Sequence, residues 1–173
     1  MTIKQQTVSP SPAIPAAAES NENAETSSPM SERFRGYLPV VVDIETGGFN
    51  ADNDAMLEIA ATLLEYDEQE TLVVADTYNY HVKPFEGANI DKASLEFTGI
   101  DPYHPLRPSQ TEQDVLKDLF SKVRQAIKQV GCKRAILVGH NAAFDQSFIN
   151  AATDRCNILS LIHISEPTRL QQI

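Results

Sequence analysis

The sequence has no tryptophan, only two cysteines, and no long uninterrupted run of apolar residues. A membrane-spanning helix needs about 20 consecutive apolar residues, so no transmembrane span is expected. The N-terminus lacks the basic stretch followed by an apolar segment that marks a secretory signal. Cys132 and Cys156 do not have the spacing of metal ligands, and two cysteines do not make a disulfide framework. We therefore expect a cytoplasmic protein without a membrane partner.

Positive charge is scarce, because 14 lysines and arginines stand against 24 acidic residues and give a formal net charge of −10. Phosphate binding requires cations, so this balance argues mildly against a nucleic-acid partner. No acidic residue lies between Asp118 and Asp145, however. That interval contains the basic residues Lys122, Arg124, Lys128, Lys133 and Arg134. They form either a solvated helix face or a local basic patch, and Arg33 and Arg35 add a second basic pair.

The length and the 42% hydrophobic fraction fit one folded domain with additional unstructured sequence. Residues 1–31 contain almost no large apolar side chains, so we predict a disordered tail there and a domain at 32–158. Residues 159–173 do not continue the preceding helical pattern, and 159–169 can be reverse-translated into the transposon-end adapter of a common sequencing-library chemistry. We interpret 159–173 as an adapter-derived tail after Ile158. A divergent native tail is the alternative.

The hydrophobic pattern predicts a chain in which strands come first and helices follow. Residues 38–44 form a near-continuous apolar run, which is typical of a strand buried on both faces. Two further strands are predicted at 56–66 and 71–82, and a short strand at 135–138. Helices are predicted at 91–97 (with Asp91 as N-cap), 109–130 and 142–153. This order indicates an antiparallel meander, then a helical crossover to a parallel strand, and hence an α/β fold with a mixed sheet.

Two acids stand at the end of the first predicted strand. Asp43 and Glu45 are two residues apart, so both side chains point to the same face of the strand. Gly47 and Gly48 follow them and allow a sharp turn. Neighbouring carboxylates repel each other, and hard divalent cations such as Mg²⁺ are bound by such oxygen clusters. The alternative is an exposed strand end with two solvated acids, because isolated Asp-x-Glu patterns are common.

A third acid follows the last predicted strand. Asp145 lies in the first turn of the helix that begins after Gly139-His140-Asn141. If strand 135–138 is parallel to strand 38–44, their carboxyl ends are adjacent and Asp145 reaches the same cavity as Asp43 and Glu45. The alternative role is stabilisation of the helix N-terminus, worth about 0.3–1 kcal/mol, and the two roles are compatible.

Three segments in this order resemble the DEDD exonuclease superfamily, and within it the ribonuclease T family most closely: V-D-I-E-T-G-G-F, F-T-G-I and G-H-N-A-A-F-D. The similarity extends over about residues 33–158. It implies a ribonuclease-H-like exonuclease fold with flanking helices, two Mg²⁺ ions (Mn²⁺ being a substitute) and a homodimer. It also implies 3′→5′ trimming of RNA 3′ ends in tRNA and other stable RNAs, with single-stranded DNA as another substrate.

The resemblance also assigns roles to individual residues. Asp43 and Glu45 match the metal ligands of the first motif, and Asp145 matches the aspartate of the second. Aromatic residues that stack on terminal bases in the family correspond to Phe49, Phe97 and Phe144; core packing is the alternative for each. Basic residues that bind substrate held in the partner subunit's site correspond to Arg33, Arg35, Lys128 and Arg134.

The sequence departs from the family pattern at two places. Ala93 stands where the family has a glutamate that contacts the terminal base, so base preference is open. The third motif, H-x-x-x-x-D, is absent: His163 is followed five residues later by Thr168, and we interpret His140 as a structural hydrogen-bonding residue. The missing histidine is the family's general base. We therefore expect the C-terminal part of the fold to be missing and the chain as written to be inactive.

Three other functions remain to be weighed against this one. A proofreading DNA exonuclease or an oligoribonuclease would share the same acids. A non-catalytic RNA-binding remnant would bind RNA without a metal. A nucleotide-binding α/β protein is disfavoured, because no glycine-rich phosphate-binding motif follows a predicted strand.

Overall fold

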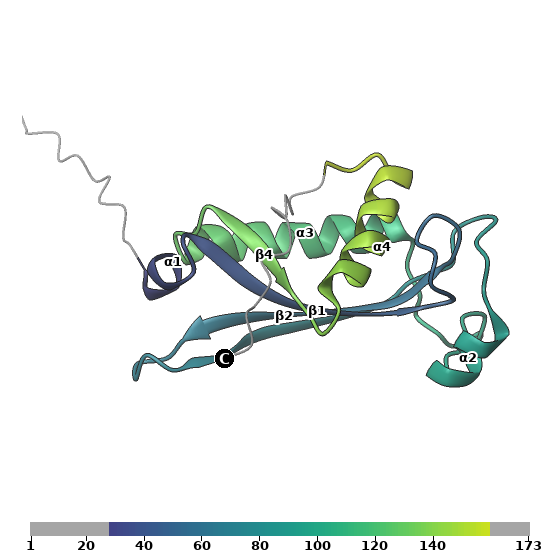
Figure 1. Cartoon of the computed structure of the whole chain (residues 1–173), viewed down its shortest axis with the longest axis horizontal. Helices are drawn as coiled ribbons and strands as arrows, with labels where there is room; N and C mark the ends of the chain where they lie inside the picture. Colours follow the sequence, from purple (N-terminus) through teal and green to yellow (C-terminus); the bar gives the residue numbers. More distant parts are fainter. Residues whose placement is uncertain (1–27, 160–173) are drawn as a thin grey trace, which may run out of the picture.

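The computed structural model describes residues 28–159 and contains a four-stranded sheet with helices beside it. The predictions for residues 1–27 and 160–173 lie outside the described residues. The strands are β1 (Tyr37–Thr46), β2 (Met56–Tyr66), β3 (Leu72–His81) and β4 (Arg134–Val138). The helices are α1 (Pro29–Arg33), α2 (Lys92–Thr98), α3 (Glu112–Gln129) and α4 (Ala142–Arg155). Figure 1 shows α1 and α2 at opposite ends of the sheet.

The sheet has the strand order β3-β2-β1-β4. β1 pairs with β2 and β2 with β3 in antiparallel fashion, whereas β4 is parallel to β1. The predicted meander with a crossover to a parallel strand is therefore confirmed. β4 pairs only with the first half of β1, ending at the pair Val41↔Val138. Among residues 28–159, the second half of β1 has no strand partner on this edge, and α4 begins beside it.

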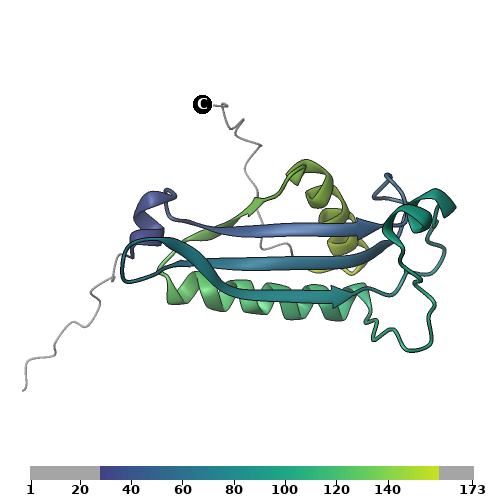
Figure 2. The ribbon, with the colours of Figure 1, turned by 90° about the horizontal axis from the view of Figure 1, so that it is seen from below.

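The hydrophobic core lies between the sheet and α3 and α4. Alternate residues of β1, including Val40, Val42 and Ile44, are buried, as expected where one face of a strand is covered. α3 contributes a buried stripe at helical spacing, consisting of Val115, Leu116, Leu119, Phe120 and Val123. Burying each large apolar side chain stabilises the fold by about 1.5–3 kcal/mol. Figure 1 shows both long helices above the strands, and in Figure 2, which is seen from below, the strands lie in front of the helices.

The prediction that β1 is buried on both faces is wrong for its second half. Val41 is 37% exposed and Asp43 is exposed as well. Within residues 28–159 the covering helices α3 and α4 lie on one face, so the side chains that point the other way meet solvent. A continuous apolar run therefore did not indicate burial of both faces here.

The predicted start of the domain at residue 32 is also corrected. Helix α1 begins at Pro29, and the hydroxyl of its N-cap, Ser28, accepts a hydrogen bond from the backbone N–H of Ser31. The side chain of Met30 is only 2% exposed and belongs to the core. The folded part therefore includes residues 28–31. The composition of the N-terminal segment concealed this, because a single methionine provides the packing.

The predicted helices are present with shifted ends. Asp91 is the N-cap residue of α2, but its side chain makes no capping hydrogen bond. α3 begins at Glu112 rather than at residue 109, because Thr111 caps it by accepting from the N–H of Asp114. Among the helices that the structure describes, none is both long and apolar enough to span a membrane.

Candidate active site

The two acids of β1 lie on the face of the sheet that points away from the core. Asp43 is exposed, and Glu45 is partly buried directly opposite Glu58 of β2. Partial burial raises the pKa of Glu45, and the negative charges of Asp43 and Glu58 raise it further. This strand end therefore holds carboxylates that repel one another, which is a setting that a cation would stabilise.

Asp145 lies beside the second half of β1 and accepts a hydrogen bond from the backbone N–H of Ile44. A Cβ atom on Gly139 would be 3.0 Å from the carbonyl oxygen of Val42 and 3.4 Å from a carboxylate oxygen of Asp145. The absence of a side chain at Gly139 thus allows the chain to pass close to β1 on its way into α4. Burial and the negative charge of Asp43 raise the pKa of Asp145. Hydrogen bonds from its own backbone N–H and from that of Ile44 lower this pKa, but the net shift is upward.

The structure places the three predicted metal ligands near one another but not in a complete coordination group. Asp43 interacts electrostatically with both Glu45 and Asp145, and carboxylate oxygens are the donors that Mg²⁺ and Mn²⁺ prefer. Within residues 28–159, however, no three Asp, Glu, His or Cys side chains are close enough to form a coordination group. The donor chemistry therefore fits a divalent ion, whereas the complete ligand set remains a prediction.

The turn after the acids is fixed by Asp54. A Cβ atom on Gly48 would lie 2.1 Å from a carboxylate oxygen of Asp54, so a side chain at this position would force the Asp54 carboxylate to move. Asp54 is buried and accepts hydrogen bonds from the backbone N–H of Asn50 (2.8 Å) and the side-chain amide of Asn89 (2.7 Å). These contacts hold the loop that carries Phe49 in one conformation.

The three predicted aromatic residues line one cavity of about 380 Å³. Phe49 and Phe97 are 85% and 91% exposed, so core packing does not explain them. Phe144 is half-buried, with its ring centroid 6.2 Å from that of Phe49 and 5.0 Å from that of the buried Phe148. The cavity is lined by Ile44, Glu45, Thr46, Phe49, Asp91, Ala93, Ser94, Phe97, Thr98 and Phe144. An acid of β1 therefore shares its surroundings with all three phenylalanines.

The predicted basic residues lie at the other end of the sheet. Arg33, Arg35, Lys128 and Arg134 are all exposed, and Arg134 is paired with Tyr37 at the start of β1. Asp43 is six residues further along this strand, about 20 Å away at 3.3 Å per residue. The basic residues therefore do not join the acids within one chain. Their predicted role toward a partner subunit's site stays a prediction.

Lys122 and His140 lie outside this basic group. Lys122 is bound by the carboxylate of Asp118 (2.6 Å) and the hydroxyl of Tyr80 (3.0 Å) on the helical side of the sheet. His140 is exposed and makes no side-chain hydrogen bond with residues 28–159, so the interpretation of it as a structural hydrogen-bonding residue is not supported.

Sequence reasoning missed Glu58 and its partners. Its carboxylate accepts from Arg107 (3.0 Å) and contacts His81 (2.9 Å) on the same face as Glu45. The feature that could have revealed this ion pair is an acid inside the apolar segment Met-Leu-Glu-Ile-Ala-Ala, because a buried strand seldom contains an unpaired charge.

A model of the Exonuclease family (RNase T) matches residues 40–161. Ribonuclease T of Vibrio vulnificus strain YJ016 is 55% identical over 130 residues, which are 75% of this chain and 60% of that protein. The chain thus spans about 60% of the length of this relative. Escherichia coli exonuclease I bound to a dT13 oligonucleotide has a similar structure, with a TM-score of 0.56 and 17% identity over 70% of this chain and 24% of that one.

A second structure of E. coli exonuclease I, a zinc-bound form in a complex with single-stranded DNA, gives a TM-score of 0.55 at 17% identity, covering 70% of this chain and 24% of that one. These likenesses confirm the predicted ribonuclease-H-like fold. Exonucleases of this kind depend on a divalent metal ion. From the match to residues 40–161 and the 55% identity, the chain belongs to the exonuclease family of the ribonuclease T type.

Proposed function

We propose that this chain carries the acidic site of a metal-dependent 3′→5′ exoribonuclease that trims the 3′ ends of tRNA and other stable RNAs. The observation that carries the proposal is the position of Glu45, which lines the aromatic cavity and is coupled to Asp43. The cavity volume of about 380 Å³ lies within the range of roughly 300–1,000 Å³ that is usual for small-molecule sites. A terminal base in this cavity would bring its phosphodiester toward the acids.

The exposed phenylalanines fit a strand end better than a duplex. Stacking on an aromatic ring requires an unpaired base and contributes about 1–3 kcal/mol per base with little sequence preference. The Asp54 contacts fix the backbone on either side of Phe49, so the loop need not be ordered when a base stacks on this ring. Ala93 lines the cavity without a polar group, and base selection at this position would rest on shape.

Asp43, Glu45 and Asp145 would hold the divalent ions, Mg²⁺ or Mn²⁺. When bound, two such ions supply an activated water and stabilise the leaving 3′ oxygen. The raised pKa values of Glu45 and Asp145 mean that both acids must lose protons at a higher pH than usual before they can bind a cation. Metal binding is therefore expected to weaken as the pH falls.

The substrate and partner follow from the relatives. The 55% identity to a ribonuclease T favours RNA. Single-stranded DNA is the second candidate, because exonuclease I in a complex with dT13 shares the fold. A homodimer would place the basic cluster of Arg33, Arg35, Lys128 and Arg134 near the acids of the other subunit. The cytoplasm is the compartment in which such RNAs are processed.

The test compares the 173-residue chain with a chimera in which residues 28–158 are followed by the C-terminal part of the V. vulnificus relative. Both are given a 5′-labelled RNA with a single-stranded 3′ end, with Mg²⁺ or with EDTA. The chain is expected to bind the RNA but to trim it poorly, and the chimera to trim it one nucleotide at a time in Mg²⁺. This outcome would also support the predicted absence of the third motif.

The Asp43→Asn variant of the chimera is the control for chemistry. It should lose more than about 100-fold in trimming rate, because even outer-shell partners of a metal ion contribute about 10–100-fold. RNA affinity in EDTA should be unchanged. Trimming by the chimera that persists in EDTA, or that survives Asp43→Asn, would contradict the proposal.

A further inference from the structure

A fourth carboxylate belongs to the acidic face of the sheet. Glu58 of β2 is directly opposite Glu45 of β1 in the antiparallel pairing. Residues paired in this way have Cβ atoms about 4.5–5.5 Å apart and point to the same face. The charge of Glu58 acts on Glu45, whose pKa it raises. Any cation bound by Glu45 therefore lies in the field of Glu58 as well.

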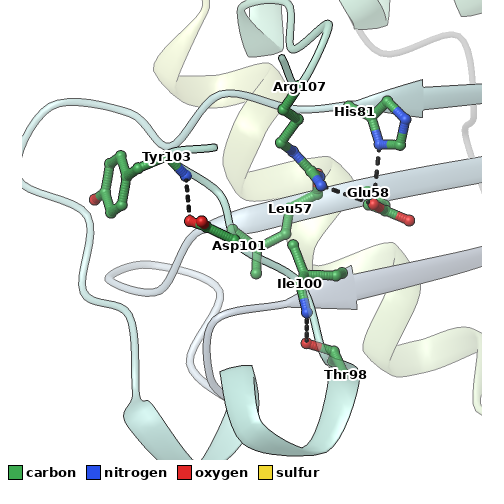
Figure 3. Close-up of polar contacts among 8 residues, drawn as sticks. All are labelled: Leu57, Glu58, His81, Thr98, Ile100, Asp101, Tyr103 and Arg107. Carbon is green, nitrogen blue, oxygen red and sulfur yellow. Dashed lines mark hydrogen bonds and ion pairs between the residues drawn. The ribbon is translucent and has the colours of Figure 1, made fainter. Parts of the chain in front are cut away.

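Arg107 is the counter-charge of this carboxylate. It comes from the segment between α2 and α3, and its side chain is only 9% exposed. Its Nη1 lies 3.0 Å from a carboxylate oxygen of Glu58, and its Nη2 donates to the carbonyl oxygen of Leu57 at 2.8 Å. The ring of His81 contacts the same oxygen of Glu58 at 2.9 Å. Figure 3 shows Arg107 and His81 converging on Glu58 from two different segments.

The position of Arg107 is fixed by an irregularity in the sheet. Between the pairs Glu45↔Glu58 and Thr46↔Met56 the register shifts, so Leu57 is an extra residue on β2. Such bulges re-aim side chains and are frequent beside active sites. The carbonyl oxygen of Leu57 accepts from the N–H of Val82 (2.7 Å) as well as from Arg107. The guanidinium of Arg107 thus binds the backbone of Leu57 and the carboxylate of the next residue, Glu58.

Stability alone does not explain this arrangement. The Nε of Arg107 is buried and has no hydrogen-bond partner among the described residues. An unsatisfied buried donor lowers stability, and an ion pair whose carboxylate is 33% exposed, as in Glu58, contributes little to stability. The arrangement retains a charge pair with an unsatisfied donor at the edge of the acidic site, and departures of this kind are concentrated at functional sites.

We propose that Glu58 and Arg107 form a fixed charge pair that sets the electrostatic potential which Asp43 and Glu45 present to a divalent cation. Glu58 strengthens cation binding through its charge, and Arg107 limits this effect while it holds the carboxylate in place. Arg107 is thus a positioning residue. The inference rests on the proposed function, since it assumes that a cation binds at these acids.

The test measures Mn²⁺ binding to the 173-residue chain by calorimetry at one fixed pH, without nucleic acid. Removing the negative charge in Glu58→Gln should weaken Mn²⁺ binding by about 3–10-fold, whereas removing the positive charge in Arg107→Met should strengthen it by about 2–5-fold. The double variant should bind close to the wild type. Arg107→Lys retains the charge and should also bind close to the wild type, although its folding stability falls because the contact with Leu57 is lost.

Matched controls carry the same charge changes on the other side of the sheet. Asp118→Asn and Lys122→Met on α3 should leave Mn²⁺ binding unchanged, because solvent and salt screen distant charges. If Arg107→Met does not fold, as judged by circular dichroism, Glu58→Gln and Arg107→Lys still distinguish charge from packing.

Two results would overturn the inference. If Glu58→Gln binds Mn²⁺ as tightly as the wild type, the carboxylate does not act on the cation. If the two single-charge variants shift affinity in the same direction, the pair is structural and not electrostatic. A wild-type chain that binds no Mn²⁺ contradicts the proposed function, and the inference fails with it.

Discussion

The two faces of the sheet differ sharply, although the same strands supply both. On the helical face Val40 and Val42 are buried in the core, whereas Val41, Asp43 and Glu45 point to the face that is open within residues 28–159. Alternation along one strand thus divides the residues that stabilise the fold from those that hold charge. Chemistry can vary on the open face without altering the packing on the other.

The phenylalanines of α4 show the same contrast between a residue in the core and a residue in the site. Phe148 is fully buried, while Phe144, one turn earlier on α4, is half-buried and faces the cavity with Phe49 and Phe97. Residues four apart lie on the same side of a helix, so one row of α4 passes from the core into the site. Site and core are therefore in direct contact, and the comparison of the two faces can be tested by substitution.

The largest effect is expected on the covered face. Phe148→Ala removes a fully buried ring that packs against Phe144 and should lower the free energy of unfolding by about 3–5 kcal/mol. Phe49→Ala, at an exposed ring in the loop after β1, should change it by less than about 0.5 kcal/mol. Urea unfolding followed by circular dichroism measures both. Similar losses of unfolding free energy for the two variants would contradict the division between core and site residues.

The next largest effect on the free energy of unfolding is expected from breaking a buried ion pair on the covered side. Arg155 donates to both carboxylate oxygens of the buried Glu112 (3.1 and 2.8 Å) and to the carbonyl oxygen of Ala51 (2.9 Å). Arg155→Met leaves Glu112 buried and unpaired and should cost about 3 kcal/mol or more. The double variant with Glu112→Gln should recover part of this loss in the same urea measurement. No recovery would show that Arg155 acts mainly through Ala51.

On the open face the expected effect is on binding and not on folding. Phe97→Ala should weaken binding of a short single-stranded RNA by about 1–3 kcal/mol, since one stacking platform is lost. Because the ring is 91% exposed, unfolding should be unaffected. Fluorescence anisotropy in EDTA measures the affinity. Leu106→Ala, at another exposed apolar residue outside the cavity, is the control that should leave the affinity unchanged.

The smallest effect concerns Asp145, which lies where the two faces meet. Burial raises its pKa above the ordinary value of 3.8, so the folded chain holds this proton more tightly than the unfolded chain does. The ionised form therefore destabilises the metal-free fold at neutral pH, and this penalty disappears as the pH falls through the raised pKa. Asp145→Asn should be more stable than the wild type at pH 7. The difference should shrink toward pH 4, as thermal melts with a chelator would show.

The order of the strands and of most helices could be predicted because periodicity reflects burial on one face. The amphipathic pattern of α3 and the motif that ends β1 are local features of the sequence. Burial of β1 on both faces was mispredicted, since Val41 is apolar in sequence whether or not anything covers it. The location of Met30 in the core depends on tertiary contacts that composition does not reveal.

The acids and aromatics of the site could be named from motifs, but the charge pair could not. Glu58 and Arg107 are 49 residues apart in the sequence, and they meet because a bulge and an irregular segment bring them together. The basic residues were predicted as one group and do lie at one end of the sheet, but their distance from the acids emerged only from the register of β1 with β4.

Gly48 has a consequence for how this protein can change over generations. A Cβ atom there would collide with the carboxylate of Asp54, which binds the backbone N–H of Asn50 and the side chain of Asn89, so a substitution at position 48 requires Asp54 to leave these hydrogen bonds. A saturation library at position 48 should favour glycine strongly, and randomising position 54 with it should relax this preference. The turn that presents Phe49 is therefore inherited as a unit, while neighbouring surface positions are free to drift.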